Sequence, residues 1–232
     1  MTTIYLVRHG QASFGAESYD QLSKKGELQA QILGQYLKKL MLEQPYVVAG
    51  SMKRHLQTAR ISLDQSFKDT EIHIDSNLNE FNHQQIFEKY QPRFSDPALL
   101  KQDVNKVKDP RAYLGQIFEG AIKRWTSNEF HQDYDESWPE FKDRVINGFD
   151  HLCEKLKTEQ PRYAVVYTSG GVISVIIGHL LGLSPEKTFA LNWSITNTSF
   201  TTLRLVGAEP QLLSLNEHHY LKEQDRDLLT WI

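Results

Sequence analysis

Short, continuous apolar runs alternate along this chain with longer stretches in which apolar residues recur at helical spacing. Runs of four or five apolar residues that stop abruptly at polar or glycine residues are typical of buried strands. Strands are predicted over 4–7, 46–49, 72–74, 163–167, 199–206 and 211–215. Helices are predicted over 23–42, 53–63, 137–157 and 172–181. Ser23 suits the N-cap of the first helix, and Pro139 lies in the first turn of the third, where proline is tolerated.

The order of these elements favours an α/β fold. Strands that alternate with helices build a mostly parallel sheet with helices on both faces, so we expect a three-layer sandwich. Residues from about 83 to 135 have a different character: they are polar, contain Pro92, Pro97 and Pro110, and show helical fragments around 112–125. We interpret this region as a helical insertion over one end of the sheet, within one domain that spans 1–232.

Composition restricts the class of protein further. Of the 232 residues, 40% are hydrophobic and 24% are charged, which suits a packed core. The 26 basic and 29 acidic residues give a net charge of −3, so nothing indicates nucleic-acid binding. We expect no signal peptide and no membrane span, because no apolar run approaches the roughly 18 residues that cross a bilayer. A cytoplasmic location follows as the default, and the one cysteine, Cys153, is expected to be a buried apolar residue.

Three of the predicted strands end in polar or glycine-rich turns: RHG at 8–10, GS at 50–51 and SGG at 169–171. The carboxyl ends of parallel strands meet at one edge of a sheet, and ligands of α/β proteins bind beyond that edge. We therefore expect these three turns to lie together and to form the functional site.

The turn at 8–10 combines residue types that suit phosphate chemistry. Arg8 offers a rigid fork of donors that matches phosphate oxygens, and a neutral His9 imidazole can attack phosphorus to form a phosphohistidine. Gly10 allows the backbone to turn sharply and to approach a ligand. Taken alone, a motif of three residues is weak evidence, because a single histidine is more often structural.

Longer motifs make the resemblance specific. LVRHGQ at 6–11 resembles the signature of the histidine phosphatase (phosphoglycerate-mutase-like) superfamily. LSKKGELQA at 22–30 matches the family's Leu-Ser/Thr-x-x-Gly-x-x-Gln-Ala segment, and SMKRHLQTA at 51–59 is similar to its Ser-x-x-x-Arg-x-x-x-Thr-Ala segment, with the arginine one place early. LNE at 78–80 corresponds to its Leu-x-Glu. The resemblance covers most of the chain and is weakest between about 83 and 140.

The resemblance implies a role for each matching residue. His9 would be the nucleophile, Arg8 and Arg54 would bind the phosphate, and Glu80 would protonate the leaving group and later activate water. A dianionic phosphate needs cationic donors and the leaving oxygen needs a proton, so this division of labour is chemically sensible. The other residues expected at the phosphate are Gly10, Gln11 and Gly170.

One departure from the family pattern affects the expected chemistry. Where the family has Ser-His-Gly-Gly after a buried strand, this chain has TSGG at 168–171, so Ser169 occupies the place of the second catalytic histidine. Losing one preorganised donor commonly costs about 10²–10³ in rate. Ser169 could act as a weaker catalytic donor, another histidine could replace the missing one, or the site could bind phosphate without efficient turnover. The candidate replacements are His55, His83, His218 and His219. Among them, His55 is expected to face a different side of its helix from Arg54.

These observations predict a phosphatase that hydrolyses a phosphomonoester. The segment FNHQ at 81–84 differs from the Arg-His-Tyr-Gly of related sugar-phosphate mutases, which makes a mutase the less favoured alternative. A phosphate-binding regulatory protein is the alternative from another class. The expected partner is a small phosphorylated substrate or a phosphoprotein, and self-association into a homodimer is left open. No cofactor is expected, and the adjacent His218 and His219 lack a third ligand, so no metal is assigned.

Overall fold

The computed structural model describes residues 1–13, 20–127, 129–207 and 209–231. The chain divides into two compact units, Met1–Glu80 with Val145–Ile232 (unit 1) and Phe81–Arg144 (unit 2). Every residue expected in the functional site belongs to unit 1.

Unit 1 is built on a six-stranded sheet with the strand order β3-β2-β4-β1-β5-β6. Its strands are β1 (Thr2–Arg8), β2 (Tyr46–Ala49), β3 (Ile72–Ile74), β4 (Tyr163–Thr168), β5 (Phe200–Val206) and β6 (Glu209–Glu217). The pairs β1–β4, β2–β4 and β2–β3 are parallel, whereas β5 is antiparallel to both β1 and β6. The prediction of a mostly parallel α/β sheet is confirmed, and the two late strands form its antiparallel part.

Four helices of this unit follow the predicted ranges closely, and two, over 185–194 and 219–224, were not predicted. They are α1 (Lys24–Leu40), α2 (Lys53–Asp64), α6 (Trp138–Glu159, which begins in unit 2), α7 (Gly170–Leu181), α8 (Pro185–Ser194) and α9 (His219–Gln224), with 3-10 turns at Ser76–Leu78 and Arg226–Leu228. Ser23 caps α1, because its side chain accepts a hydrogen bond from the Gly26 N–H. Gly182 ends α7 in the left-handed conformation with φ of 64°, which glycine adopts without steric cost.

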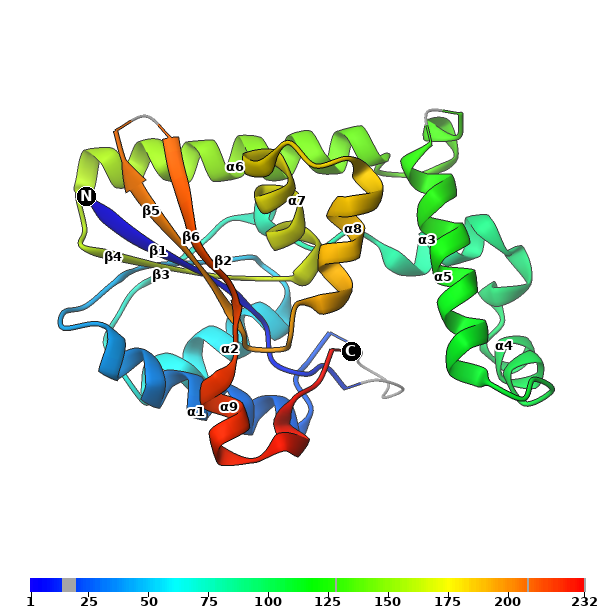
Figure 1. The fold of residues 1–232 in the computed structure, drawn as a ribbon, viewed down its shortest axis with the longest axis horizontal. Coiled ribbons are helices and arrows are strands. Elements are labelled where there is room, and N and C mark those ends of the chain that lie inside the picture. The colour runs from blue at the N-terminus through cyan, green and yellow to red at the C-terminus, as the bar shows by residue number, and fades with distance from the viewer. Residues whose placement is uncertain (14–19, 128, 208, 232) are drawn as a thin grey trace. The chain divides into compact units, whose positions relative to one another are not determined.

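The sheet is covered on both faces. Figure 1 shows α6, α7 and α8 over one face and α1, α2 and α9 over the other. On the second face, alternate residues of β1 and β4 point into a core with α1, α2 and α9; this core includes Val7, Leu33, Ala59, Val165 and Tyr220. The lone cysteine, Cys153 on α6, is buried, and burial raises the pKa of its thiol to about 12, which fits the expected packing role.

The strand register brings the three expected turns together. In the parallel pair of β1 and β4, Arg8 lies opposite Thr168, and in the pair of β2 and β4, Ala49 lies opposite Tyr167. The His9 N–H continues the first ladder by donating to the Thr168 carbonyl over 2.8 Å, and the Gly50 N–H donates to the Tyr167 carbonyl over 3.0 Å. All three strands therefore end at the same level, and the expected meeting of their turns at one edge is confirmed.

Unit 2 is helical, as predicted for the region from about 83 to 135. It contains α3 (His83–Tyr90), α4 (Pro97–Val104) and α5 (Pro110–Thr126), with 3-10 turns at Pro92–Ser95 and His131–Asp133. Its aromatic side chains pack together: the ring of Trp125 lies 4.9 Å from that of Phe81 and 5.6 Å from those of Trp138 and Phe141. The Trp125 indole N–H donates to the Glu136 carbonyl over 3.0 Å, so its polar group is satisfied.

Within the part of the chain that the structure describes, no helix is long and apolar enough to span a membrane.

Candidate active site

The His9 imidazole is buried at the end of β1 and held in one orientation. Its Nδ1 lies 2.7 Å from the Gly10 carbonyl oxygen, and its Nε2 accepts a hydrogen bond from Arg54 Nε over 3.2 Å. A carbonyl oxygen only accepts hydrogen bonds, so we assign the ring proton to Nδ1 and the lone pair to Nε2. The Asn197 side chain also donates to the His9 carbonyl over 3.1 Å, which fixes the backbone at this turn.

The surroundings of His9 keep its ring neutral. Burial lowers the pKa of His9 well below its ordinary value, and the positive charges of Arg54 and Arg8 and the neighbouring His55 lower it further. The hydrogen bond to the Gly10 carbonyl opposes this shift without cancelling it. A neutral imidazole with its lone pair on Nε2 is the form that acts as a nucleophile, once the Arg54 N–H that this lone pair accepts has moved to an oxygen of the substrate.

Gly10 lets this turn approach the start of α1. A Cβ atom at Gly10 would lie 2.5 Å from the carbonyl oxygen of Gly26, a distance too short for nonbonded atoms. The Gly10 N–H donates to Thr58 Oγ1 over 3.0 Å, which connects the turn to α2 as well. The first two motifs therefore meet in space, where Gly10 leaves room for the backbone of Gly26 and Gly26 leaves room for the backbone of Gln11.

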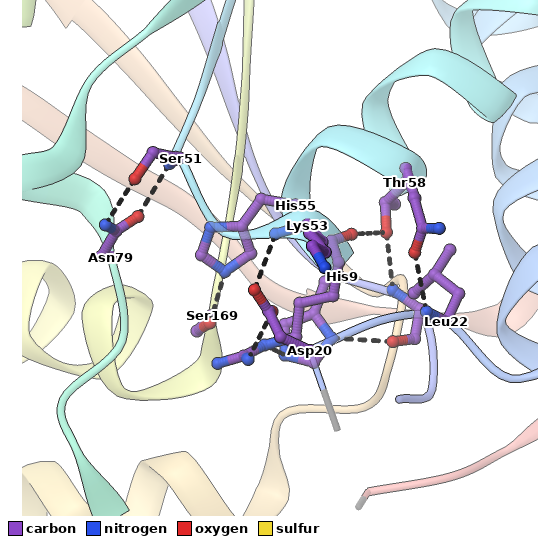
Figure 2. A network of polar contacts seen from close by, with 12 residues as sticks. His9, Asp20, Leu22, Ser51, Lys53, His55, Thr58, Asn79 and Ser169 are labelled. Carbon is purple, nitrogen blue, oxygen red and sulfur yellow. Dashed lines mark hydrogen bonds and ion pairs between the residues drawn. The ribbon is translucent and has the colours of Figure 1, made fainter. Parts of the chain in front are cut away.

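Arg54 lies in the first turn of α2 with its guanidinium next to His9. Besides its bond to His9, Arg54 Nη1 forms an ion pair with Asp20 Oδ1 at 2.9 Å, and the side chain of Arg54 is only 4% exposed. The other oxygen of Asp20 accepts from the Lys53 N–H at the start of α2 over 2.9 Å (Figure 2). A helix N-terminus and an arginine favour an anion at this place, and here the carboxylate of Asp20 fills that role. Asp20 was not among the residues predicted for the site, because no sequence motif connects it to α2.

The Arg8 guanidinium donates hydrogen bonds to two backbone carbonyls. Its Nη1 bonds to the Ile195 carbonyl and its Nη2 to the Trp231 carbonyl, the latter over 2.8 Å. A Cβ atom at Gly170 would lie 3.5 Å from Arg8 Nε, so Arg8 is beside the start of α7. The expected role of Arg8 in phosphate binding stays a prediction.

Glu80 lies at the N-terminus of α7. Its Oε2 accepts from the Gly171 N–H over 3.1 Å, which holds the carboxyl group at the start of the helix. The acid expected from the Leu-x-Glu motif is thus brought to the turn after β4, next to Gly170. Its role in proton transfer stays a prediction.

Ser169 and His55 form a buried pair. Ser169 Oγ lies 2.6 Å from His55 Nε2, and both residues are fully buried (Figure 2). The ring centroid of His55 is 5.6 Å from that of His9. Burial, followed by the charge of Arg54, lowers the pKa of His55 well below its ordinary value, so this ring is also neutral. As expected, the two side chains point to different sides of α2, and both lie at the site, because Arg54 reaches His9 and His55 reaches Ser169.

Gln11 belongs to a network that supports the turn after β1. Its backbone N–H donates to Gln29 Oε1 over 2.8 Å, and its own side-chain oxygen accepts from the Ser23 hydroxyl over 3.0 Å. Gln29 is fully buried and donates from Nε2 to the Leu228 carbonyl and to Thr230 Oγ1. The second motif contains Gln29 but predicted no role for it. In the structure its side-chain amide joins the turn at 8–11 to the chain segment at 228–230.

These contacts place the neutral His9 ring in a site with two arginines. Among residues 1–13, 20–127, 129–207 and 209–231, no group of three His, Cys, Asp or Glu side chains is placed to hold a metal ion. Positive charge next to His9 comes from Arg54 and Arg8, and backbone N–H groups lie in the first turns of α2 and α7. Such a set of donors suits an anion with several oxygens, such as a phosphoryl group.

Comparisons with known proteins agree with this class of site. The sequence profile of the histidine phosphatase superfamily (branch 1) matches residues 4–126 and 96–218. A search of curated protein sequences found no match. Because the profile match covers most of the chain, the chain belongs to the histidine phosphatase superfamily, as its motifs predicted.

Solved structures of this fold include both mutases and phosphatases. Phosphoglycerate mutase from Bacillus anthracis str. Sterne is similar with a TM-score of 0.67 and 17% identity, over 96% of each chain. A phosphoserine phosphatase variant from Entamoeba histolytica in complex with phosphoserine has a TM-score of 0.66 and 19% identity, over 95% of this chain and all (100%) of that one. The mycobacterial glucosyl-3-phosphoglycerate phosphatase has a TM-score of 0.62 and 19% identity, over 93% and 99%. At these identities the likeness shows a phosphoglycerate-mutase-like fold.

Proposed function

We propose that this protein is a phosphatase that hydrolyses a phosphomonoester through a phosphohistidine intermediate on His9. The observation that carries the proposal is the state of the His9 ring: it is buried and neutral, with its proton on the side of Gly10 and its Nε2 lone pair beside Arg54. A nucleophile needs that lone pair, and the developing negative charge needs the adjacent guanidinium.

The reaction divides into two displacements at phosphorus. In the first, His9 Nε2 forms a bond to phosphorus while the bond to the substrate oxygen breaks, and Glu80 gives its proton to the departing oxygen. In the second, water attacks the phosphohistidine, Glu80 takes a proton from that water, and the nitrogen–phosphorus bond breaks. His9 and Glu80 return to their starting states, and the products are the alcohol and inorganic phosphate.

The donors around His9 support the same chemistry. Arg54 already bonds to His9 Nε2, so its guanidinium lies next to the point of attack. Gly170 and Gly171 begin α7, and backbone N–H groups at a helix start stabilise oxyanions. Arg8 is beside Gly170, which fits a second cationic contact to the phosphoryl oxygens.

A mutase is the nearest alternative, because it shares the first displacement. The two activities differ in the acceptor of the phosphoryl group, which is water in a phosphatase and a second hydroxyl of a phosphorylated sugar acid in a mutase. The segment at 81–84 lacks the Arg-His-Tyr-Gly pattern of the mutases, which supports water as the acceptor.

The test is release of phosphate from p-nitrophenyl phosphate at about pH 6. The wild-type protein and His9→Ala are compared, with His151→Ala as a matched control because His151 is exposed on α6. We expect turnover in the wild type and the control, and a loss of more than about 10⁴-fold in His9→Ala. Full activity in His9→Ala would contradict the proposal. No turnover in any of the three would favour the phosphate-binding role instead.

We further propose that turnover needs no metal ion, because arginines supply the positive charge. Activity should be the same with and without EDTA. A loss in EDTA that a divalent cation restores would overturn this part of the proposal.

A further inference from the structure

We propose that His55 and Ser169 together supply the hydrogen-bond donor that a single histidine after β4 supplies in the family pattern. In this pair Ser169 donates its hydroxyl proton to an oxygen of the transferring phosphoryl group, and His55 is the positioning residue that directs that hydroxyl. The inference rests on the proposed function and names the two residues that take the place of the family's second catalytic histidine.

The pair lies where such a donor is needed. Ser169 directly precedes α7 in the turn after β4, and the turn after β1 with His9 is its neighbour in the sheet. His55 enters from α2, and its ring centroid is 5.6 Å from that of His9. The imidazole that the motif lacks at 169 is therefore present in the same corner of the site, contributed by another element.

The hydrogen-bonding state of His55 determines the direction of the bond. His55 Nε2 lies 2.6 Å from Ser169 Oγ, whereas its buried Nδ1 has no hydrogen-bond partner among the residues that the structure describes. A buried N–H without a partner is rarer and more costly than a buried acceptor without one. The proton of the neutral ring therefore belongs on Nε2, which donates to Ser169 Oγ. Because the serine oxygen then accepts from His55, its own proton is left to point at a ligand.

Gly50 gives His55 the room to adopt this position. A Cβ atom at Gly50 would overlap His55 Nδ1 and would lie 2.9 Å from the side-chain oxygen of Asn79. The end of β2 is thus fitted to the imidazole ring, which explains a glycine at the second of the three strand ends. A substitution at Gly50 should displace His55 without removing it.

The first experiment removes each partner and then both. On p-nitrophenyl phosphate, His55→Ala and Ser169→Ala should each lower kcat by about 10²–10³, with KM changed less than about threefold, because the donor acts on the transition state. The double variant should lose no more than the worse single variant, since two residues that act as a unit are not additive. Gly50→Ala should lower kcat in the same direction, and the exposed His151→Ala should not.

The second experiment moves the imidazole to the family position. Ser169→His alone should be poorly active, because the new ring would collide with His55, whose Nε2 lies 2.6 Å from the serine oxygen. Ser169→His combined with His55→Ala should recover at least tenfold over His55→Ala. His55→Gln should stay within about tenfold of the wild type, because its amide N–H can replace the donor on Nε2.

Binding of orthovanadate gives a readout that does not depend on turnover. Vanadate imitates the transition state of phosphoryl transfer, so His55→Ala and Ser169→Ala should weaken it by about 10²-fold and weaken inorganic phosphate much less. Thermal unfolding midpoints close to that of the wild type would show that the variants fold.

The outcomes separate this inference from the proposed function. If His9→Ala is inactive while His55→Ala has wild-type kcat and wild-type vanadate binding, the phosphatase stands and the pair is merely structural. If His9→Ala is active, the proposed function falls. The proposed role of the pair would be overturned if vanadate did not bind the wild type, or if Ser169→His combined with His55→Ala had no higher kcat than His55→Ala alone.

Discussion

The turns that follow β1 and β4 are neighbours in the sheet, but they obtain their chemistry differently. The first turn carries Arg8, His9 and Gly10 in one continuous motif, and its imidazole is oriented by the carbonyl of the next residue. The second turn has Ser169 in the expected place of a histidine, and an imidazole reaches it from α2 instead. An imidazole can therefore be brought to the same place in a site either by the turn itself or by a neighbouring helix.

The two turns also differ in what they tolerate. A side chain added to the first turn at Gly10 would meet backbone atoms of α1, whereas one added to the second at Gly170 would meet the side chain of Asn192. A side chain can rotate away but a helix backbone cannot, so the first turn is the more rigid frame. The proposed nucleophile, His9, belongs to the rigid turn, and the proposed donor, Ser169, belongs to the other.

After the loss expected for His9→Ala, the largest effect concerns proton transfer next to the second turn. Glu80→Gln should lower kcat on an alkyl phosphate by about 10²–10⁴, because a poor leaving group needs a proton from the general acid. The loss on p-nitrophenyl phosphate should be much smaller, because nitrophenolate leaves without a proton. Equal losses on both substrates would show that Glu80 holds α7 through its bond to the Gly171 N–H rather than transferring a proton.

The difference in rigidity can be measured directly. Gly10→Ala should lower the free energy of unfolding by about 3 kcal/mol, at the upper end for overpacking, because its Cβ would meet the Gly26 carbonyl oxygen at 2.5 Å. Gly170→Ala should cost about 1 kcal/mol, because the overlapping atom belongs to a side chain. Urea unfolding of both variants would check the order, and an equal cost for the two would remove the distinction between the turns.

The two buried histidines should make stability depend on pH. Burial lowers the pKa of His9 and of His55 below the value of about 6.5 that a histidine has in the unfolded chain. The unfolded state therefore binds more protons below that pH, and the stability present at neutral pH is lost as pH falls. The slope should reach at most about 1.4 kcal/mol per pH unit for each histidine.

Unfolding midpoints from about pH 7.5 to 5, in buffers free of phosphate, would test this dependence. His55→Gln should remove the part that comes from the second turn and leave the part from His9. A profile unchanged in that variant would contradict the buried, neutral state of His55. Because the pKa of His9 is already low, its protonation should not reduce kcat/KM as pH falls through about 6.5.

The smallest expected effect concerns Asp20. Its carboxylate bonds to Arg54 and to the Lys53 N–H, so it competes with a phosphate for the same donors. Asp20→Asn should tighten binding of inorganic phosphate by about threefold to tenfold, as expected for the loss of one partly exposed ion pair of about 1 kcal/mol. Calorimetry would measure the change. Weaker phosphate binding would show instead that Asp20 orients Arg54 for the ligand.

Local patterns were enough to predict the strands of unit 1, four of its helices and the alignment of its strand ends, but not α8 or α9. The buried runs of β1, β2 and β4 each stop at a turn residue, and parallel strands align such turns at one edge. His9 was predicted because its partners Arg8 and Gly10 are adjacent in sequence. Glu80 followed from a second short motif.

The pairing of His55 with Ser169 was beyond local patterns, because it depends on how α2 docks against β4. Neighbouring helix residues point about 100° apart, so Arg54 and His55 were expected on different sides of α2. The site wraps around the first turn of α2, so both directions lead into it. Asp20 was missed for a similar reason, since only the fold brings it to the N-terminus of α2.

The most direct test of the account is to find which residue carries the phosphoryl group during turnover. The wild-type protein would be mixed with p-nitrophenyl phosphate, quenched rapidly in base to preserve phosphohistidine, and digested for mass spectrometry. The account predicts phosphorylation of His9, at the turn after β1, and none in His9→Ala. A phosphoryl group on Ser169 or His55, or steady turnover with no phosphorylated residue, would contradict it.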